Sequence, residues 1–422
     1  MRFPNLRDWL SWQEGLHPQA IDLSLGRVRR AAVRMGIEKP PFTLVSVAGT
    51  NGKGSCIAYL EKLFLEAGFR VGAYTSPHLC HYNERVRLDG ADVSDDALVA
   101  AFTHVDEARR DTLTYFEFGT LAAMDIFCTA AIDIGLLEVG LGGRLDAVNV
   151  FDADLAVITQ VAIDHEDWLG AGRNAIGLEK AGILRAGCPA VCGDARPPAT
   201  IAEAAANLGS QLYSAGVEYS IHDHAAGWDW HGPEMKFEGL ARPRSGGKEQ
   251  LYNASAALMA AALLRDSHPF SQDNARQAIA AARLPGRIQC IPGRVEWLFD
   301  VAHNVAAAEA LAGFLEQRAR VPTTAVFGVM ADKDANGIAA ALAPMVDRWI
   351  LVAPDNPRSL SVGDLAAVIE SVTKAEIVTA DNVEQGLSWA AEVADDGDRI
   401  MVFGSFYLVG PALSWHAVYC DR

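Results

Sequence analysis

The stretch Val45-Ser-Val-Ala-Gly-Thr-Asn-Gly-Lys-Gly-Ser55 decides the fold of this chain, because an apolar segment runs directly into a glycine-rich turn. Its three glycines allow backbone N–H groups to converge on phosphate oxygens, and its lysine can reach the terminal phosphates. The Ser55 hydroxyl suits Mg²⁺. A helix expected over residues 56–67 adds its positive N-terminal end. The stretch therefore predicts a strand, a phosphate-binding loop and a helix.

This loop departs from the common GxxxxGK[ST] pattern at two points. Val47 stands where the first glycine would be, and Gly54 separates Lys53 from Ser55. A generic nucleotide-binding loop is therefore not the best match. The alternative is an ordinary glycine-rich turn with an exposed lysine, but such turns rarely combine three glycines with Lys and Ser at these offsets.

The size and charge of the chain narrow the class of protein. Its 422 residues exceed the usual size of one hydrophobic core, so two domains are expected. A formal net charge of -17 argues against nucleic acid or an anionic membrane as a partner. The N-terminus has no apolar leader segment, and the longest apolar run, residues 254–264, is too short to span a bilayer. We expect a monomer in the cytoplasm.

The seven cysteines are scattered along the chain, and Cys188 and Cys192 are the only close pair. No second Cys or His pair accompanies them. This spacing predicts buried thiols rather than a zinc site.

Apolar runs alternate with helical patterns along the chain, which predicts parallel strands joined by crossover helices. Residues 219–248 interrupt this alternation and read as an antiparallel excursion with exposed turns. A second alternation after residues 284–286, the expected hinge, predicts a smaller open parallel sheet. The expected strands are residues 43–48, 71–75, 134–139, 155–159, 190–192, 295–299, 324–327, 349–352, 376–379 and 399–403, and the clearest later helices are residues 199–208 and 254–264.

Polar residues that directly follow these strands are candidate site residues, because open parallel sheets place their chemistry at the carboxyl ends of strands. Ser76 follows one strand, and a helix-capping turn is its alternative reading. Glu138 ends the next, where a carboxylate is costly unless it is paired or ligates a cation. His165 lies beyond a third, where a packed or capping histidine is the alternative. The three residues fit a metal site beside the phosphate loop.

Taken together, these segments resemble the Mur ligase superfamily, and within it the folylpolyglutamate synthase and dihydrofolate synthase family. The order and spacing of the motifs over most of the chain carry this resemblance. The motifs are Gly49-Thr-Asn-Gly-Lys-Gly-Ser55, Thr75-Ser-Pro-His-Leu79, Asn83-Glu-Arg-Val86, Tyr115-Phe-Glu-Phe-Gly-Thr120, Glu138-Val-Gly-Leu-Gly-Gly-Arg-Leu-Asp146, Asp164-His165, Glu179-Lys-Ala-Gly-Ile183, Pro285-Gly-Arg287, Phe299-Asp-Val-Ala-His-Asn304 and Phe403-Gly-Ser-Phe406.

The resemblance implies an α/β fold with two domains. Residues 1–284 would form an ATP-binding P-loop domain with a parallel sheet, and residues 285–422 a smaller Rossmann-like glutamate ligase domain. It also implies an ATP-dependent amide ligase that takes dihydropteroate, folates and L-glutamate as substrates, with ATP and two Mg²⁺ ions at the site.

The same resemblance assigns roles to residues of this chain. Lys53, Lys180 and His303 would be catalytic, with Lys180 carbamylated, although a surface lysine is the reading of Lys180 from its sequence context alone. ATP would be held by Gly49, Thr50, Asn51, Gly52, Lys53, Gly54, Ser55, Arg287, Asp300 and Asn304. Ser55 would serve one metal ion and Ser76, Glu138 and His165 the other, while Phe116 and Asp146 would line the pterin-side pocket. Tyr407 stands where the family often has His, so it receives no role.

The expected chemistry begins with activation of a carboxylate, because the oxygen of a carboxylate is a poor leaving group. Transfer of the ATP γ-phosphate makes an acyl phosphate, which the amine of glutamate then attacks.

Three other functions stay open. A cell-wall Mur ligase carries a further domain ahead of its P-loop, and only 48 residues precede Gly49 here. A nucleotide-binding switch leaves Glu138, His165 and Lys180 unexplained. A ligase restricted to one of the two folate reactions is the closest alternative.

Overall fold

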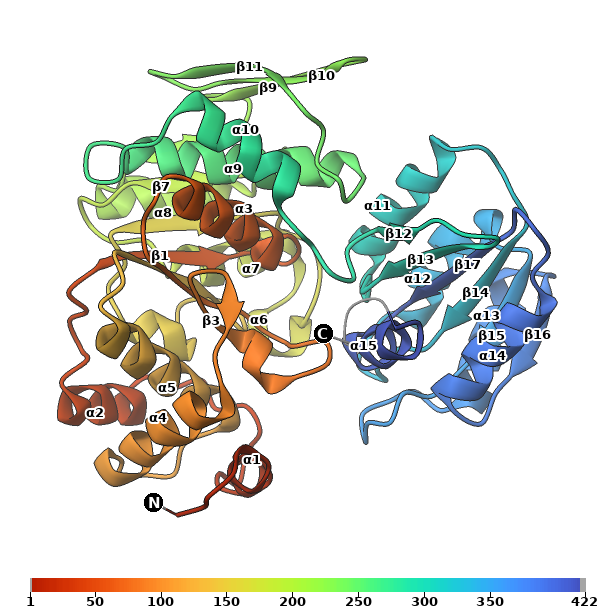
Figure 1. Cartoon of the computed structure of the whole chain (residues 1–422), viewed down its shortest axis with the longest axis horizontal. Coiled ribbons are helices and arrows are strands. Elements are labelled where there is room, and N and C mark those ends of the chain that lie inside the picture. Colours follow the sequence, from red (N-terminus) through yellow and green to blue (C-terminus); the bar gives the residue numbers. More distant parts are fainter. Residues whose placement is uncertain (1, 418–422) are drawn as a thin grey trace.

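A computed structural model describes residues 2–417 and shows two α/β domains side by side, each built on its own sheet (Figure 1). The strands of the N-terminal domain are apolar and almost fully buried at the centre of their sheet. They lie parallel except at one edge, where β3 and β4 run antiparallel to their neighbours. Their order across the sheet is β4 (Ala91–Asp92), β3 (Val86–Leu88), β2 (Val71–Tyr74), β5 (Ile134–Glu138), β1 (Thr43–Ala48), β6 (Leu155–Ile158), β7 (Ala190–Cys192) and β8 (Leu212–Ser214).

Helices cover both faces of this sheet, as expected for parallel strands joined by crossovers. One face carries α3 (Lys53–Glu66), α9 (Lys248–Leu263) and α10 (Gln272–Ala281), which share one apolar core with the sheet. A second core lies on the other face. It involves α1 (Leu6–Glu14), α2 (Gly26–Met35), α4 (Asp95–Ala108), α5 (Tyr115–Ala130), α6 (Glu166–Leu169), α7 (Gly172–Ala181), α8 (Ala199–Leu208) and the 3₁₀ turns η1 (Tyr82–Arg85) and η2 (Ala147–Val150).

The predicted antiparallel excursion is confirmed as a sheet with the order β11 (Lys236–Leu240), β10 (Gly227–His231) and β9 (Ser220–His224). It lies against the α9 and α10 face, at the top of Figure 1. The side chains of Trp228, Trp230 and Phe237 are buried there in the apolar core that α9 and α10 share with the large sheet. This packing anchors a segment that the sequence marks mainly by its turns.

The C-terminal domain has a smaller sheet, with one difference from prediction. The five strands predicted from the sequence are parallel, as expected, but a further edge strand, β12, pairs antiparallel with β13. The sequence does not reveal β12 because it is short and only half-buried, so it carries no apolar run. The strand order is β12 (Gln289–Ile291), β13 (Glu296–Asp300), β17 (Arg399–Phe403), β14 (Thr323–Phe327), β15 (Arg348–Leu351) and β16 (Glu376–Thr379).

Two apolar cores again enclose this sheet. On one face lie α11 (Val305–Glu316), α12 (Ala335–Leu342) with the turn η3 (Ala343–Met345), and α13 (Val362–Val372). On the other lie α14 (Val383–Val393) and α15 (Phe406–Trp415). In Figure 1, α11 and α15 lie on the side of this domain that faces the N-terminal domain. The two-domain α/β fold expected from the sequence is therefore present, while the exact boundary at residue 284 stays a prediction.

Two helices begin earlier than predicted. The helix expected at residue 56 begins at Lys53, so the P-loop lysine belongs to its first turn. The helix expected at residue 254 begins at Lys248. Its first turns contain Gln250 and Asn253, which are polar yet buried and therefore break the apolar pattern used to find it.

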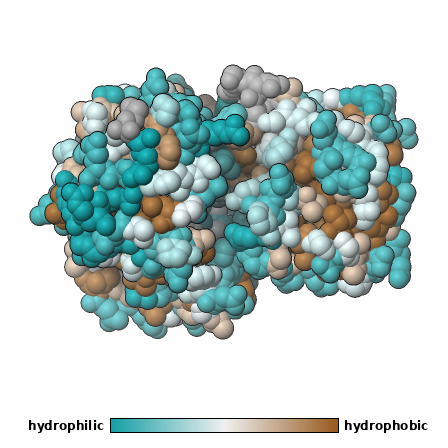
Figure 2. Space-filling view, turned by 90° about the horizontal axis from the view of Figure 1, so that it is seen from below, coloured by the Kyte–Doolittle hydropathy of each residue, from teal (hydrophilic) through white to brown (hydrophobic). Residues whose placement is uncertain are grey.

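The surface and the thiols agree with the remaining expectations only in part. Within residues 2–417, no helix is both long and apolar enough to cross a membrane. Figure 2 shows a largely hydrophilic face on the larger, N-terminal domain. Cys188 and Cys192 are free thiols as predicted, but only Cys192 is buried.

Candidate active site

The phosphate-binding loop connects β1 to α3. Gly49 and Gly52 have φ angles of 155° and 88°, which residues other than glycine rarely adopt. A Cβ atom on Gly49 would lie 1.8 Å from Thr159 Oγ1, and one on Gly52 would lie 2.2 Å from Asn253 Oδ1. Both positions therefore require glycine for conformation and for space.

The loop is fixed by residues that follow β6. Thr159 Oγ1 donates to Asn51 O at 2.8 Å, and Thr50 Oγ1 donates to Ala162 O at 3.0 Å. Lys53 Nζ lies 3.2 Å from both Gly49 O and Thr50 O. Its ammonium thus lies over the loop, where backbone N–H groups and the N-terminal end of α3 would also meet a phosphate.

Glu138, at the end of β5, lies beside this lysine. Its side chain is buried, and its Oε1 atom is 4.0 Å from Lys53 Nζ. The Ser76 backbone N–H donates to Oε2 at 3.1 Å. Burial raises the pKa of Glu138, although Lys53 and the Ser76 N–H oppose the change. A carboxylate so poorly compensated in a buried place favours a cation next to it.

These residues fit a divalent cation in part. Mg²⁺ prefers oxygen ligands, and the Glu138 carboxylate lies close to Ser76. The carboxylate also lies next to the phosphate loop, because a Cβ atom on Gly54 would be 3.5 Å from Glu138 Oε2. Ser55 is buried in the same first turn of α3. Over the described part of the chain, no three His, Cys, Asp or Glu side chains converge as a metal cluster. A cation here would therefore draw on hydroxyls, one carboxylate and the phosphates of a nucleotide.

His165 lies in a different environment from Glu138. Its Nε2 atom is 3.2 Å from the Nζ atom of Lys333, which comes from the C-terminal domain. Burial lowers the pKa of His165, and Asp164 opposes this effect. A cation bound through Nε2 would have to replace the lysine. The predicted grouping of His165 with Ser76 and Glu138 on one metal stays a prediction.

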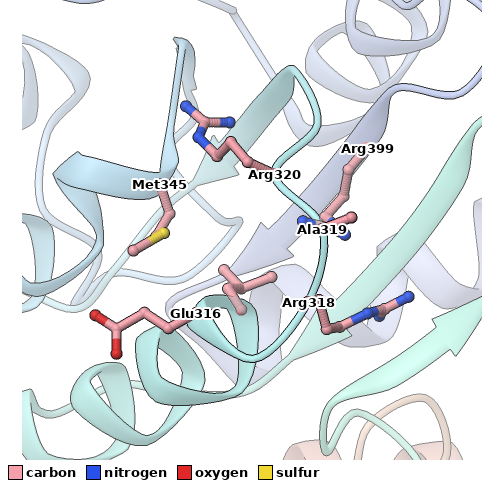
Figure 3. Close-up of a pocket in the computed structure, with 7 residues that line it drawn as sticks. Glu316, Arg318, Ala319, Arg320, Met345 and Arg399 are labelled. Atoms are coloured by element: carbon pink, nitrogen blue, oxygen red, sulfur yellow. The ribbon is translucent and has the colours of Figure 1, made fainter.

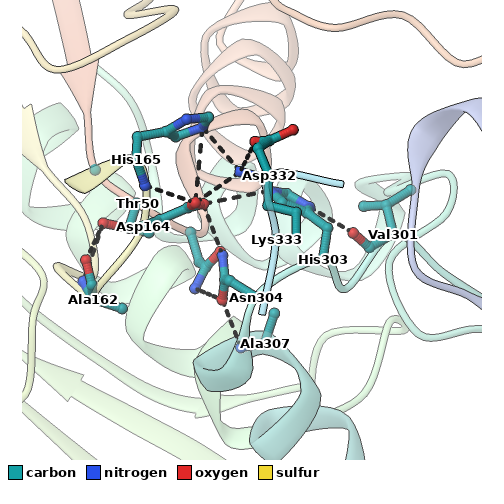
Figure 4. A network of polar contacts seen from close by, with 12 residues as sticks. Thr50, Ala162, Asp164, His165, Val301, His303, Asn304, Ala307, Asp332 and Lys333 are labelled. Atoms are coloured by element: carbon teal, nitrogen blue, oxygen red, sulfur yellow. Dashed lines mark hydrogen bonds and ion pairs between the residues drawn. The ribbon is translucent and has the colours of Figure 1, made fainter. Parts of the chain in front are cut away.

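Figure 4 shows that Asp164 is the centre of a polar network between the two domains. Lys333 Nζ donates to Asp164 Oδ1 at 2.7 Å, and Asn304 Nδ2 donates to Oδ2 at 3.3 Å. His303 Nε2 lies 3.7 Å from Oδ2. Burial alone would raise the pKa of Asp164, but Lys333, His165 and His303 lower it to about 2.

Asn304 also contacts the phosphate loop directly. Its amide donates to Asn51 Oδ1 at 2.9 Å, and the Asn51 amide donates back to Asn304 Oδ1 at 3.2 Å. Asn304 is at the same time the N-cap of α11, accepting from Ala307 N at 3.0 Å. Asn304, which follows β13, thus brings the carboxyl end of that strand against the phosphate loop.

His303, Asp300 and Arg287 lie on the C-terminal side of this interface. His303 Nδ1 is 2.8 Å from Val301 O, and burial lowers its pKa to about 4, so the ring is neutral at pH 7. Asp300 accepts from Ile288 N and Ala302 N, each at 2.7 Å. The Arg287 guanidinium lies 4.9 Å from the centre of the Phe406 ring, and burial lowers its pKa.

Lys180 and Asp146 form a buried region beside the loop. Lys180 is 3% exposed, and burial, aided by Lys53, lowers its pKa to about 7. Asp146 accepts from Leu141 N at 2.7 Å and Val148 N at 3.1 Å, but burial still raises its pKa to about 7. The sequence reading of Lys180 as a surface lysine is therefore wrong.

Phe116, the other residue predicted for the pterin side, lies in the first turn of α5. Its ring centre is 5.7 Å from the ring centre of Tyr74. The Phe116 ring also packs directly on Gly140, because a Cβ atom there would lie 2.7 Å from Phe116 Cζ. Gly140 precedes the loop that carries Asp146. The structure therefore brings Phe116 close to the Asp146 loop, while the pterin role of both stays a prediction.

Sequence reasoning missed three residues that contact the predicted site. Asn253 lies against Gly52, and Gln250 Nε2 donates to Ser55 Oγ at 3.4 Å. Lys333 binds the Asp164–His165 turn. Lys333 follows β14 in the polar stretch Met330-Ala-Asp-Lys-Asp334, which could have marked it as a candidate residue but does not show which loop of the other domain it meets. No comparable signal marks the two α9 residues, which are hidden inside a helix.

A cavity of about 240 Å³ lies in the C-terminal domain near Arg399, where β17 begins (Figure 3). Its arginines are paired: Arg318 and Arg399 with Glu296, and Arg320 with Asp347. It therefore offers little net charge to a ligand. The lining residues are Leu315, Glu316, Arg318, Ala319, Arg320, Met345 and Arg399.

Comparison with known proteins places this site in a family. Residues 286–406 match the model of the Mur ligase, glutamate ligase domain. The dihydrofolate synthase/folylpolyglutamate synthase of Escherichia coli is 42% identical over 412 residues, covering 96% of this chain and 94% of the relative. The folylpolyglutamate synthase of Lacticaseibacillus casei is 32% identical, covering 86% and 87%.

Solved structures agree with this assignment. Escherichia coli FolC in complex with DHPP and ADP has a TM-score of 0.93 at 39% identity and covers 98% of each chain. A bifunctional folylpolyglutamate synthase/dihydrofolate synthase with Mn, AMPPNP and L-glutamate bound has a TM-score of 0.90 at 41% identity, again with 98% coverage of each.

The fold and site thus define an ATP-dependent ligase of the Mur type, with the glutamate ligase domain at its C-terminal end. The chain belongs to the dihydrofolate synthase/folylpolyglutamate synthase family. The family resemblance and the ligase class predicted from the sequence are confirmed.

Proposed function

We propose that the chain adds L-glutamate to dihydropteroate and to folylglutamates, at the expense of ATP and through an acyl phosphate. The observation that carries this proposal is the reciprocal amide pair of Asn51 and Asn304. It places the phosphate loop of one domain directly against the strand ends of the other. Phosphoryl transfer in the first domain and amine attack from the second then occur in one shared space.

The first step transfers the γ-phosphate of ATP to the carboxylate of the acceptor, and ADP leaves. Lys53 and the loop N–H groups offset the charge that develops on the phosphate oxygens. Two Mg²⁺ ions, one served by Ser55 and the other by Ser76, Glu138 and His165, would add further positive charge there. Glu138 stays aligned because the Ser76 N–H binds one of its oxygens.

In the second step the glutamate amine attacks the acyl carbon, forming the amide and releasing phosphate. His303 is neutral at pH 7 and has its Nδ1 atom fixed by the Val301 carbonyl, so its Nε2 atom can accept a hydrogen bond from the attacking amine and orient it. Contact between the domains keeps water from hydrolysing the intermediate. Arg287, Asp300 and Asn304 would hold the nucleotide, and Phe116 and Asp146 the pterin side of the acceptor.

We also propose that Lys180 is carbamylated. A lysine with a pKa of about 7 is partly neutral at physiological pH, and only the neutral amine takes up CO₂. The resulting carbamate is an anion that can orient a cation near Lys53.

The test is a product assay with the purified protein, ATP, Mg²⁺, L-glutamate and either dihydropteroate or tetrahydrofolate. Formation of dihydrofolate in one reaction and of an extended folylglutamate in the other supports the proposal. A protein that makes only one product is a restricted ligase, as the name of the Lacticaseibacillus casei relative would allow. ATP binding without product in either reaction would instead favour a nucleotide-binding switch.

A further inference from the structure

Lys333 is a buried charge that joins the two domains. It lies in the turn between β14 and α12, and its side chain is only 7% exposed. Its Nζ atom is 2.7 Å from Asp164 Oδ1, 3.2 Å from His165 Nε2 and 3.4 Å from Asp332 Oδ2. A buried ammonium is costly unless it is paired, and two of these three partners belong to the other domain.

The Asp164 carboxylate is the matching feature of the N-terminal domain. Its side chain is 9% exposed, and it meets Lys333, His303 and Asn304, all three from the C-terminal domain. From its own domain it accepts the His165 N–H at 2.9 Å, which fixes the turn after β6. The Asp164 carboxylate therefore contacts three side chains of the C-terminal domain at the place where that domain meets the phosphate loop.

An alternative is that Lys333 serves only the folding of its own domain. Its partner there, Asp332, is already engaged by Arg358 at 2.7 Å. The contact with Asp164 is shorter than the one with Asp332, and it joins two side chains that are each less than a tenth exposed. The neighbouring Asn51–Asn304 contact joins neutral amides, which form weaker hydrogen bonds than charged groups.

We propose that Lys333 is a positioning residue that fixes the C-terminal domain against the Asp164 turn and thereby sets the distance between the phosphate loop and His303. Its role is to hold Asn304 against Asn51 and His303 beside Asp164 when the acyl group is transferred. This inference rests on the proposed function for its kinetic consequence only. The docking of the domains is measurable without any activity.

The first experiment is amide hydrogen exchange, read by mass spectrometry, on the full-length parent and four variants. Lys333→Met and Asp164→Asn should each raise exchange at least about tenfold in peptides covering residues 160–165 and 303–308, because the domains separate more often. Lys333→Arg keeps the charge and should stay within about threefold of the parent. Lys374→Met, at an exposed lysine of the same domain, is the surface control and should match the parent.

The double variant Lys333→Met/Asp164→Asn separates a direct contact from two independent effects. Since each single change already breaks the pair, the double variant should exchange no faster than the faster single variant. Multiplied effects would overturn the proposal. Parental exchange of residues 160–165 in Lys333→Met would overturn it as well.

The second experiment measures steady-state kinetics of the same proteins. Lys333→Met should lower kcat at least about tenfold and change the KM for the folate acceptor by less than about threefold, since Phe116 and Asp146, the residues assigned to the pterin side, lie on the other domain. Lys333→Arg should recover most of kcat. A Lys333→Met enzyme with parental kcat would overturn the proposal. If the parent itself forms no product, the proposed function fails while the exchange experiment still decides the role of Lys333.

Discussion

The side-chain amides of Asn51 and Asn304 donate hydrogen bonds to each other across the two domains, at 3.2 and 2.9 Å. Asn51 belongs to the phosphate loop, and Asn304 is the N-cap of α11, the first helix of the C-terminal domain. The pair therefore ties a catalytic loop to a helix cap. A change at either residue acts on local stability and on the domain contact at once, and the two effects can be separated.

Asn304→Ala should lower both stability and ligation. Loss of the N-cap of α11 is worth about 1 kcal/mol of unfolding free energy, measured by urea titration. Loss of the contact with Asn51 should in addition lower kcat several-fold. Asn382→Ala is the matched control, because Asn382 caps α14 in the same way. The control should lose similar stability and keep parental kcat; equal loss of kcat in both would show that Asn304 acts only as a cap.

Lys53→Ala should abolish ligation and leave the fold intact. The lysine ammonium is held over the phosphate loop by Gly49 O and Thr50 O, so its loss removes a charge contact to the transferring phosphate. We expect kcat to fall about a hundredfold or more with an unchanged circular dichroism spectrum. Lys62→Ala, on the same helix and paired with Glu66 at the surface, should retain parental activity. Activity of Lys53→Ala within about tenfold of the parent would remove the phosphate-loop assignment.

Glu138→Gln and His165→Ala should both weaken the response to Mg²⁺. Each change removes a charge or a ligand with little change of fold, so the Mg²⁺ concentration needed for half-maximal activity should rise in each. His104→Ala removes an exposed histidine of the same domain and serves as the control. An unchanged response in His165→Ala alone would assign that ring to Lys333 rather than to a cation.

Lys180→Ala should be nearly inactive, and acetate should partly restore it. The proposed carbamate is an anion in a buried space, so a small carboxylate can occupy the space that the side chain leaves. Carbon NMR of the parent supplied with ¹³C-bicarbonate should show a carbamate signal. Rescue by small amines instead of acids, or absence of that signal in active enzyme, would contradict the modification.

The pH dependence of stability gives a separate test of Lys180 in buffer free of CO₂. Burial lowers the folded-state pKa to about 7, below the unfolded value, so the cost of the buried ammonium is fully present below pH 7. That cost, on the order of a few kcal/mol, is relieved as pH rises from about 7 towards the unfolded pKa. Lys180→Met should therefore be more stable than the parent at pH 6.5, by urea unfolding. The difference should shrink as the pH is raised to 9.

The sequence predicts the parallel strands well because each is an apolar run followed by a polar residue, as with Glu138 after β5. It misses β3, β4, β8 and β12 because these strands are short, lie at or next to the edges of their sheets and have no continuous apolar run. It misses Lys333 for a different reason. Which loops of two domains face each other depends on their relative orientation, and no local pattern of residues carries that information.

The short segment 282–288 joins α10 to β12, and it limits how far the two domains can part. Fully extended, it spans about 25 Å. Each domain therefore meets the other at an effective concentration near the millimolar range, whatever the protein concentration in solution. The Lys333–Asp164 ion pair, with the weaker amide pair of Asn51 and Asn304 beside it, is then sufficient to populate the docked arrangement. Dilution should leave that population unchanged, whereas lengthening the segment with glycine and serine should reduce it.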